Sequence, residues 1–530
     1  PVRAWDGEAL GRRGAGTVEA IGFGWWARSV RSVQSAGVSL DPRTPVIVGA
    51  GQYLNRSDDL ADALEPAALM ERAVLAAVDD AGLDGPPAAD SVRVVNIIGW
   101  RYRNAPRFLA QRLGLDDCEL AETSSGGNSP QALVNQTALD IRSGAVDVAV
   151  LSGAEAFRTY MRARRSGERL PWPKAPDDDR PVTIGKPLDM NHPHEQALGI
   201  MEPVKVYPMF ETALRAAAGR SVDDHRARLG RLWSDLSGVA ASNPYAWIRE
   251  AKTPEEIVTV GPDNRMIGLP YPKVMNSNSD VDMGAALIMC SLEAARRLGV
   301  DDDRMVFPQS GTDCHEHNYV SNRDTFATTP AIELGGRRAL DLAGVSIDDV
   351  SLIDLYSCFP SAVQLGAQSL GIDLSRQWSR TGGLPFAGGP WNNYPMHAIA
   401  TIVGELREQR DEFGLVWANG GYATKHAFGV YAATPPTSGF RHENPQAEID
   451  ALPKRELAVG ADAAGPATVE AYTVMFTRDN EPEMALASCR LADGRRAWGR
   501  SSDSTVASAM CEGEWVGAAV TLDADAELRI

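Results

Sequence analysis

The sequence predicts an α/β protein with a duplicated core and a β-rich C-terminal region. Strands and helices alternate as far as Pro436, and the strands are nearly continuous apolar runs, which is typical of parallel sheets covered on both faces. The order of elements in the first half recurs in the second half. Beyond Pro436 the pattern changes to short strands of alternating apolar residues, which favours a small antiparallel barrel.

The first half begins with the apolar run 45–51, which predicts a buried strand that ends in a glycine turn. A helix is expected to follow, because Pro66 stands near its start, apolar residues recur at helical spacing, and Gly82 closes it. The remaining predicted elements of this half are strands at 92–98 and 147–151 and a helix at 130–141.

The second half repeats this order. The run 78–83 precedes a strand in the first half, and the similar run 340–345 precedes the strand 351–355 in the second. A helix at 396–408 and a strand at 414–418 then match the helix and strand that end the first half. Two copies of one βαβαβ unit predict a pseudo-twofold fold with its active site between the halves.

The chain is expected to divide into four regions, because 530 residues exceed what one ordinary core accommodates. A long irregular segment at about 156–271 interrupts the first half and contains predicted helices at 204–218 and 223–241. We interpret this segment as a loop domain, since excursions of this length are usually functional. The four predicted regions are an N-terminal extension at 1–43, the first half at 44–290, the second half at 291–436, and an antiparallel OB-like β-barrel at 437–530.

Composition excludes several classes of function. A net charge of −18 argues against binding of nucleic acid, and no run approaches the roughly 18 apolar residues of a membrane span. The six cysteines form no C-x-x-C pair, which fits a reducing, cytoplasmic location. The run Cys314-His315-Glu316-His317 offers three metal ligands without a fourth, so we expect no metal site.

Four short segments rich in glycine and small residues stand at 122–131, 354–359, 388–390 and 417–421. Together they resemble the four active-site loops of the thiolase superfamily, and the segment 354–359 resembles the corresponding loop of the sterol-carrier-protein subfamily. In catalytic thiolases these loops carry a nucleophilic cysteine, an asparagine or histidine, a further histidine and an acid/base cysteine. The positions that match them in this chain are Gly126, Tyr356, Gly389 and Ala418.

The resemblance extends from Arg43 to about Pro436. The barrel-like tail differs from a sterol-carrier domain, which is α/β, and matches the group called thiolase-like protein type 1. The resemblance implies two thiolase halves, a loop domain that contacts coenzyme A, and an appended β-barrel. It also implies coenzyme A or an acyl-CoA as the ligand, no further cofactor, and a monomer or a homodimer.

The residues at the matching positions argue against thiolase chemistry. Thiolysis and Claisen condensation need a thiolate that accepts the acyl group, and Gly126 has no side chain. Gly389 replaces the histidine that would activate a nucleophile. The backbone N–H groups of Gly126 and Gly420 could still form an oxyanion hole. We therefore expect a protein that binds acyl-CoA thioesters in lipid, fatty-acid or steroid metabolism and does not turn them over as a thiolase does.

Two alternatives stay open. In the first, the resemblance includes thiolase-like proteins that lack the cysteine and act as retro-aldol lyases on acyl-CoA with an OB-fold partner. Tyr356 would then be the acid or base of the reaction. Otherwise, Tyr356 fills the volume that the lost catalytic groups leave. His426 follows the last glycine loop, so it either lines the rim of the site or packs at the start of the next helix. The other alternative is a non-catalytic partner protein whose barrel mediates association.

A basic cluster stands out in this acidic chain. It lies at the start of the predicted loop domain, where the resemblance implies that the nucleotide phosphates of coenzyme A are held, and consists of Arg158, Arg162, Arg164, Arg165, Arg169 and Lys174. Of these, Arg162, Arg164 and Arg165 are the candidates for binding coenzyme A. Arginine is well suited to phosphate. The cluster therefore either binds phosphates or forms a solvated positive face.

Overall fold

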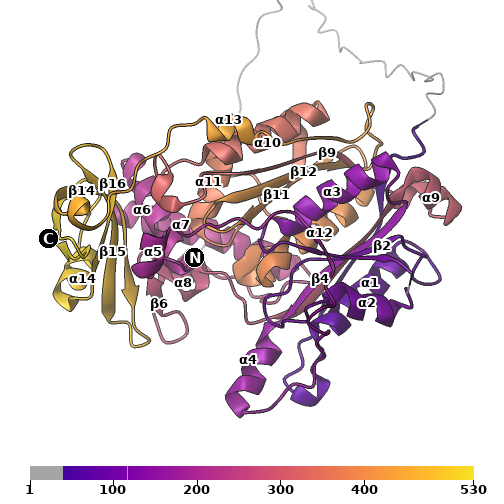
Figure 1. Cartoon of the computed structure of the whole chain (residues 1–530), viewed down its shortest axis with the longest axis horizontal. Coiled ribbons are helices and arrows are strands. Elements are labelled where there is room, and N and C mark those ends of the chain that lie inside the picture. The colour runs from indigo at the N-terminus through magenta and orange to yellow at the C-terminus, as the bar shows by residue number, and fades with distance from the viewer. Residues whose placement is uncertain (1–39, 116) are drawn as a thin grey trace, which may run out of the picture. The chain divides into compact units, whose positions relative to one another are not determined.

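The computed structural model describes residues 40–115 and 117–530. Most of the predicted N-terminal extension, residues 1–39, lies outside the described residues. Residues 41–530 form one unit in which two mixed sheets are layered with helices (Figure 1). The predicted boundaries between the four regions stay predictions.

The first sheet contains β1 (Pro45–Leu54), β2 (Ser91–Val94), β3 (Glu119–Thr123), β4 (Val148–Ala156), β5 (Val182–Ile184) and β8 (Asp282–Ser291). Their order is β1-β8-β4-β2-β3-β5. The prediction of an all-parallel sheet is wrong at β8, which is antiparallel to both β1 and β4. The chain re-enters the sheet with Asp282 opposite Ala156, so β8 begins where β4 ends and must run back along it.

The second sheet repeats this arrangement. It contains β9 (Phe307–His315), β10 (Val350–Leu355), β11 (Phe413–Gly420), β12 (Lys425–Ala432) and β13 (Arg441–Glu443). The order is β10-β11-β12-β9-β13. Here β12 is antiparallel to β9 and β11, and β11 is parallel to β10. In the first sheet, β8 is likewise antiparallel to β1 and β4, and β4 is parallel to β2. The predicted duplication is confirmed.

Helices form three layers around the two sheets. The central layer is α3 (Ser129–Ser143) and α12 (Tyr394–Glu408), and the outer helices are α1 (Pro66–Asp80), α2 (Ala105–Leu113), α9 (Leu292–Arg297), α10 (Pro330–Ala343) and α11 (Pro360–Leu370). Leu133 of α3 and Ile399 of α12 share one apolar cluster with Leu287 of the first sheet and Val416 of the second. The central helices are therefore apolar on more than one side.

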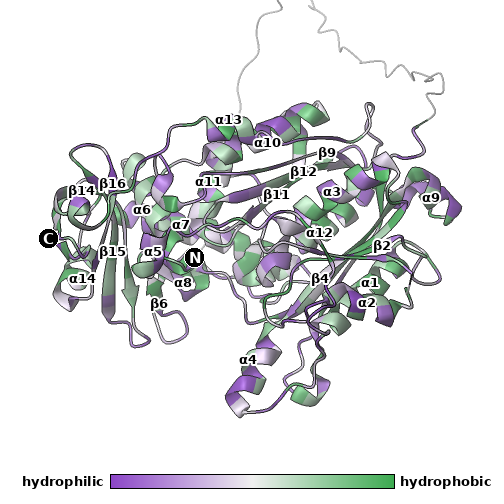
Figure 2. Cartoon of the chain, viewed as in Figure 1, coloured by the Kyte–Doolittle hydropathy of each residue, from purple (hydrophilic) through white to green (hydrophobic). Residues whose placement is uncertain are grey.

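The excursion between β4 and β8 is mostly helical. Its elements are α4 (Phe157–Ser166), α5 (Pro193–Ala197), α6 (Pro203–Ala217), α7 (Val222–Ser242), α8 (Pro254–Val258), β6 (Met266–Gly268) and β7 (Tyr271–Pro272), together with β5. The two predicted helices are confirmed as α6 and α7. Hydrophobic residues concentrate in the first sheet and α1, whereas α4 is largely hydrophilic (Figure 2). No helix in the described ranges is long and apolar enough to cross a membrane.

The C-terminal region is the predicted antiparallel sheet, and it is OB-like in its order. After α13 (Gln446–Asp450), its elements are β14 (Gly465–Phe476), β15 (Pro482–Leu491), β16 (Arg496–Ser501), α14 (Ser504–Cys511), β17 (Ala519–Leu522) and β18 (Leu528–Arg529). The strand order is β16-β15-β14-β17-β18, and a parallel bridge between Arg500 and Glu527 joins the two ends. These five strands form a barrel with its helix between the third and fourth strands, and β6 and β7 extend the sheet to seven strands through the pairing of β6 with β14.

Candidate functional site

The four glycine-rich segments converge between the two halves. The first joins β3 to α3, the second joins β10 to α11, the third precedes α12, and the fourth joins β11 to β12. A Cβ added to Gly420 of the fourth segment would lie 2.7 Å from Asn128 Oδ1 and 3.1 Å from Gly127 N of the first. A Cβ on Gly127 would lie 2.9 Å from Tyr356 Cζ of the second. The absence of side chains at these glycines lets the segments approach this closely.

Lys425 occupies the space into which a side chain at position 126 would project. A Cβ added to Gly126 would overlap Lys425 Nζ and Asn128 Oδ1, and it would lie 2.9 Å from Lys425 Cε. The space at position 126, which the sequence resemblance predicts to match the nucleophile of thiolases, is therefore filled from a different segment of the chain.

Lys425 is a buried amine and a residue that the sequence reasoning missed. Only 8% of its surface is exposed, and its Nζ donates a hydrogen bond to Ser125 O. Burial lowers the pKa of Lys425 to about 8, because the charged form loses hydration. In the sequence it stands four residues after Gly421, at the start of an apolar strand and next to His426, and no local pattern marks it as the side chain that faces the loops.

Tyr356 lies next to Gly127 of the first segment, where its hydroxyl would meet a Cβ placed on that glycine. Its ring packs edge-to-face on Tyr394, with ring centroids 5.6 Å apart. Burial raises the pKa of Tyr356 well above its ordinary value. The phenol therefore keeps its proton at neutral pH and can donate a hydrogen bond, but it is a weaker acid than an exposed tyrosine.

The other two matching positions are closely packed. The Gly389 N–H donates to Asn278 O at 2.8 Å, and a Cβ on Gly389 would lie 3.2 Å from that oxygen and 3.4 Å from Ser277 Cβ. Ala418 is fully buried in β11, opposite Ala427 of β12. An imidazole at position 389 would require the neighbouring 277–278 segment to move.

His426 lies in β12 and not at the start of a helix. Because neighbouring residues of a strand point to opposite faces, its ring lies on the face away from Lys425. There it is fully buried, and its Nδ1 accepts a hydrogen bond of 3.3 Å from Trp417 Nε1. Burial depresses the pKa of His426 well below its ordinary value. The structure therefore brings Lys425, and not His426, to the converging loops.

The fourth segment is held in place by Tyr207 of α6. Its hydroxyl accepts hydrogen bonds from Asn419 Nδ2 and Ala423 N, both at 2.9 Å, and donates to Gly421 O at 3.0 Å. Its ring stacks on Phe359 of the second segment, with centroids 4.6 Å apart. One helix of the excursion thus orients two of the four segments.

Three acceptor atoms around the loops have no hydrogen-bond partner among the described residues, namely Asn128 Oδ1, Ser357 Oγ and Asn419 Oδ1. Buried polar atoms are nearly always paired with protein, water or a ligand. Hydrogen-bond acceptors are thus available to a ligand or to water where the segments meet.

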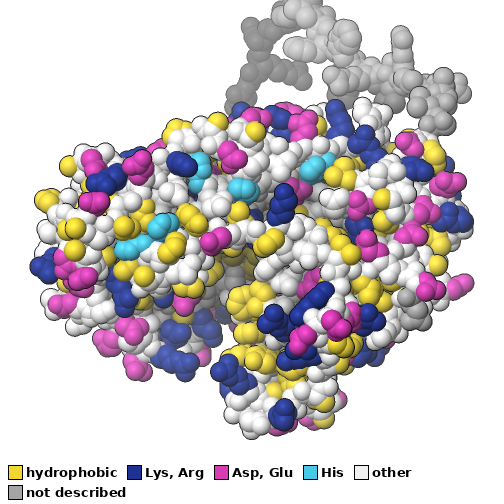
Figure 3. All heavy atoms as spheres, viewed as in Figure 1, with side chains coloured by type: hydrophobic (Ala, Val, Ile, Leu, Met, Phe, Trp, Pro, Cys, Tyr) yellow, Lys and Arg dark blue, Asp and Glu magenta, His cyan; other side chains and the backbone are white. Residues whose placement is uncertain are grey.

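The basic cluster divides into two parts on α4. Arg158 and Arg162 contact Ser57 O and Asp58, whereas Arg164 and Arg165 are exposed in the last turn. Dark-blue and yellow side chains alternate on the projection that carries α4, next to a hollow in the surface (Figure 3). The exposed pair is the part of the cluster available to a ligand.

A row of partly exposed aromatic rings connects α4 with the third segment. Neighbouring centroids are 5.2 to 6.4 Å apart along the row Trp391, Phe157, Tyr160, Trp100 and Trp172. Trp391 directly follows the Gly389-Pro390 segment and is 39% exposed. Lys174 lies over Trp100, with its Nζ 4.6 Å from the ring centroid.

The C-terminal region matches a known family model. Residues 445–527 match the model for the thiolase-like protein type 1 additional C-terminal domain. A monomeric SCP2-thiolase like protein type 1 from Mycobacterium smegmatis is similar over 92% of this chain and 99% of its own, with 33% identity and a TM-score of 0.78. The chain belongs to this family.

More distant proteins share the fold. An acetyl-CoA acetyltransferase of Methanocaldococcus jannaschii is 21% identical over 295 residues, which are 55% of this chain and 67% of that protein. The Ltp2-ChsH2(DUF35) aldolase has 18% identity and a TM-score of 0.56, and human mitochondrial 3-ketoacyl-CoA thiolase in complex with CoA has 15% and 0.53. Both structures cover 74% of this chain and 98% of their own.

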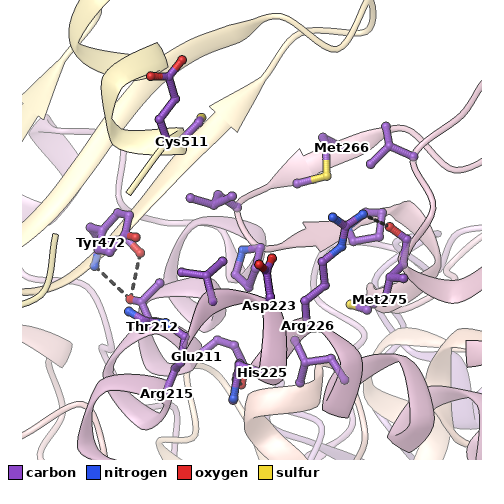
Figure 4. A pocket seen from close by; sticks show the side chains of 18 of the residues that line it. Glu211, Thr212, Arg215, Asp223, His225, Arg226, Met266, Met275, Tyr472 and Cys511 are labelled. Carbon is purple, nitrogen blue, oxygen red and sulfur yellow. Dashed lines mark hydrogen bonds and ion pairs between the residues drawn. The ribbon is translucent and has the colours of Figure 1, made fainter. Parts of the chain in front are cut away.

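The type 1 thiolase-like chain also has a cavity of about 480 Å³ between its barrel and the excursion (Figure 4). Thr212 of α6 donates to Tyr472 O of β14 at its wall, at 3.0 Å. Arg215 is paired with Glu514, and Asp223 adds a carboxylate to the lining. Arg226 also lines the cavity and donates to Val258 O.

Within residues 40–115 and 117–530, no group of three or more His, Cys, Asp or Glu side chains is arranged to hold a metal ion. In the run that begins at Cys314, the thiol donates to Ala331 O and His315 Nδ1 contacts Glu316 O at 2.8 Å. These side chains are engaged with the backbone.

Proposed function

We propose that this chain binds a CoA thioester where its four segments converge and catalyses neither thiolysis nor Claisen condensation. The observation that carries the proposal is Lys425 in the space of the missing nucleophile at Gly126. A thiolate at that position would have to displace both Lys425 and Asn128. The backbone of the first segment nevertheless leads directly into the N-terminus of α3.

No nearby cysteine replaces the lost thiolate. Cys358 follows Tyr356 in the second segment, but it is buried and burial raises its pKa to about 12. A thiol with this pKa is almost entirely protonated at neutral pH, and the thiol is a far weaker nucleophile than the thiolate. The backbone N–H groups of Gly126 and Gly420 are our candidates for contacting the thioester oxygen.

For the nucleotide part of the ligand we propose the surface of α4. Adenine can stack on partly exposed aromatic rings, and phosphates pair with arginine. The aromatic row runs from Trp391 toward α4, and Arg164 and Arg165 are exposed on that helix. CoA is the ligand class that combines an aromatic base, phosphates and a thioester.

The first expected result is binding without thiolysis. Titration calorimetry with CoA and acetoacetyl-CoA should give saturable heat, and acetoacetyl-CoA with free CoA should show no acetyl-CoA formation above background. The physical reason is the lack of a thiolate and of a histidine to activate one. Cysteine-dependent turnover by the unaltered chain would contradict this assignment of the segments.

The second expected result concerns the exposed arginines. Changing Arg164 and Arg165 together to alanine should weaken CoA binding about tenfold, or about 1.4 kcal/mol, because two exposed phosphate contacts are lost. Added salt should weaken binding to the native chain in the same direction. The matched control is the double change of Arg296 and Arg297, which also end a helix. Equal CoA affinity of the two double variants would mean that Arg164 and Arg165 form a solvated positive face and do not bind CoA.

A second candidate function is aldol or retro-aldol cleavage of a β-hydroxyacyl-CoA. Two observations favour it: the similarity to an aldolase and the protonated Tyr356 among the segments. Because burial raises the phenol pKa, Tyr356 stays protonated, so it would act on the substrate oxygen as a hydrogen-bond donor and not as the base. In this case Tyr356→Phe should abolish aldehyde or ketone release and leave the Kd within about twofold. If the native chain releases no product from a β-hydroxyacyl-CoA panel, binding without catalysis is the better account.

A further inference from the structure

We propose that Lys425 is the reactive group of this site and forms an imine with the keto group of a bound 3-ketoacyl thioester. The inference rests on the proposed function, because it requires that the thioester binds at the converging segments. It names a substrate class that binding alone does not require.

Geometry carries the first step. The amine of Lys425 fills the space of a side chain at Gly126, which is the position that matches the family's attacking atom. A group at this position meets the acyl part of a thioester held by the segments. About 8% of its surface stays exposed, so the residue is not fully enclosed.

Residue type carries the second step. Of 52 lysines and arginines only seven are lysine, namely Lys174, Lys186, Lys205, Lys252, Lys273, Lys425 and Lys454. All seven are in the described ranges, and Lys425 is the one classed as buried. Arginine is always charged in proteins, whereas a buried lysine can lose its proton and react with carbonyls. If this position required only a positive charge for structural reasons, arginine would serve equally well.

The surroundings favour a free amine. Among the described residues no carboxylate forms an ion pair with Lys425, and its Nζ donates to the neutral Ser125 O. With a pKa of about 8, about a tenth of the amine is neutral at pH 7. An exposed lysine is neutral in less than about a thousandth of molecules at the same pH.

The reaction conserves atoms and involves no redox change. The nitrogen lone pair forms a bond to the ketone carbon, and the carbonyl oxygen takes up a proton as the nitrogen loses one, which gives a carbinolamine. That hydroxyl then leaves as water together with the second proton of the nitrogen, and a C=N bond remains. This proton passes from nitrogen to oxygen through a neighbouring hydroxyl group that ends unchanged, and the protonated phenol of Tyr356 in the second segment is the candidate for it.

The ketone class follows from the same chemistry. Attack of the amine on a thioester would form an amide and release the thiol, which would block Lys425 permanently. Attack on a ketone is reversible by water, so the group is regenerated. A 3-ketoacyl thioester presents a ketone two carbons from the thioester carbonyl, within the same acyl chain.

The test is reductive trapping. The native chain is incubated with acetoacetyl-CoA, treated with sodium borohydride and digested for peptide mass spectrometry. We expect one reduced adduct, on Lys425, that depends on both the ligand and borohydride. Lys425→Arg keeps the charge and should give no adduct, whereas the control Lys273→Arg should still give it at Lys425.

Calorimetry on the same samples separates the two proposals. Binding of acetoacetyl-CoA without an adduct on Lys425, or with an adduct on another lysine, overturns the inference and leaves the proposed function standing. An adduct that forms without borohydride is an amide and also overturns it. If acetoacetyl-CoA does not bind, both the proposed function and this inference are contradicted.

A ligand-free measurement guards against a variant that fails to fold. Competitive labelling of the native chain with trace acetic anhydride, from pH 6 to 11, reports the titration of every lysine. The labelling of Lys425 should reach half its maximum about two pH units below that of the exposed lysines. A common midpoint for all of them would overturn the inference.

Discussion

Replacing Tyr207 by phenylalanine is expected to lower the free energy of unfolding by about 2–4 kcal/mol. The hydroxyl serves three buried groups, since it accepts from Asn419 Nδ2 and Ala423 N and donates to Gly421 O. Phenylalanine keeps the ring and its stacking on Phe359. Each group left unpaired costs about 1–3 kcal/mol, and partial relaxation reduces the sum.

The measurement is urea unfolding at pH 7. Tyr245→Phe is the matched control, because Tyr245 is 40% exposed and its hydroxyl can be hydrated in either state. The same variant also tests how the fourth segment is supported, since Ala423 has a φ of 49°, which is unfavourable for a residue with a Cβ. A loss below about 0.5 kcal/mol would mean that α6 does not hold this segment through the tyrosine hydroxyl.

Replacing Lys425 by methionine is expected to stabilise the protein at pH 7 by about 1–3 kcal/mol. The pKa of Lys425 is about 8 in the folded chain and about 10.4 in an unfolded chain, so retaining the charge in the fold costs about 3 kcal/mol below pH 8. Methionine has similar length and no charge. The lost hydrogen bond to Ser125 O offsets part of the gain.

The sign of the pH dependence distinguishes this cause from better packing. Between about pH 8 and 10.4 the unfolded chain holds a proton on Lys425 that the folded chain has lost, so this group makes the native protein more stable as pH rises. The advantage of the methionine variant should therefore shrink over this range and vanish near pH 10.5. The control Lys273→Met, at an exposed site, should show no such trend. A methionine variant that is less stable at pH 7 would contradict the cost of burying Lys425.

A stability gain combined with loss of the borohydride adduct would have a clear meaning. Residues that serve binding or catalysis are often kept at a cost to stability. Lys425 would then be a group that the fold holds in an unfavourable environment because its chemistry requires that environment.

Much of the fold followed from local patterns. The helices α6 and α7 were predicted at 204–218 and 223–241, and the structure has them at Pro203–Ala217 and Val222–Ser242. The duplication followed from similar runs before β2 and β10. The helix α14 was missed, because its eight residues offer little periodicity and its cap, Asp503 accepting from Thr505 N, is a local contact that an alternating pattern hides.

The direction of β8 depended on tertiary structure. Its apolar residues predict a buried strand, and this was confirmed, but burial is the same for a parallel and an antiparallel strand. The return of a long excursion to the end of β4, with Asp282 beside Ala156, decided the direction.

The same division applies to the candidate site. The sequence by itself determined which segments form the loops, because runs of glycine and small residues after strands are local features. It also offered Lys425 and His426 as neighbours, with no local signal to choose between them. The pairing of β11 with β12, which sets Gly420 opposite Lys425 and Asn419 opposite His426, turned the lysine toward Gly126 and the histidine toward Trp417. A shift of one residue in this pairing would have exchanged the two side chains, since neighbouring residues of a strand point to opposite faces.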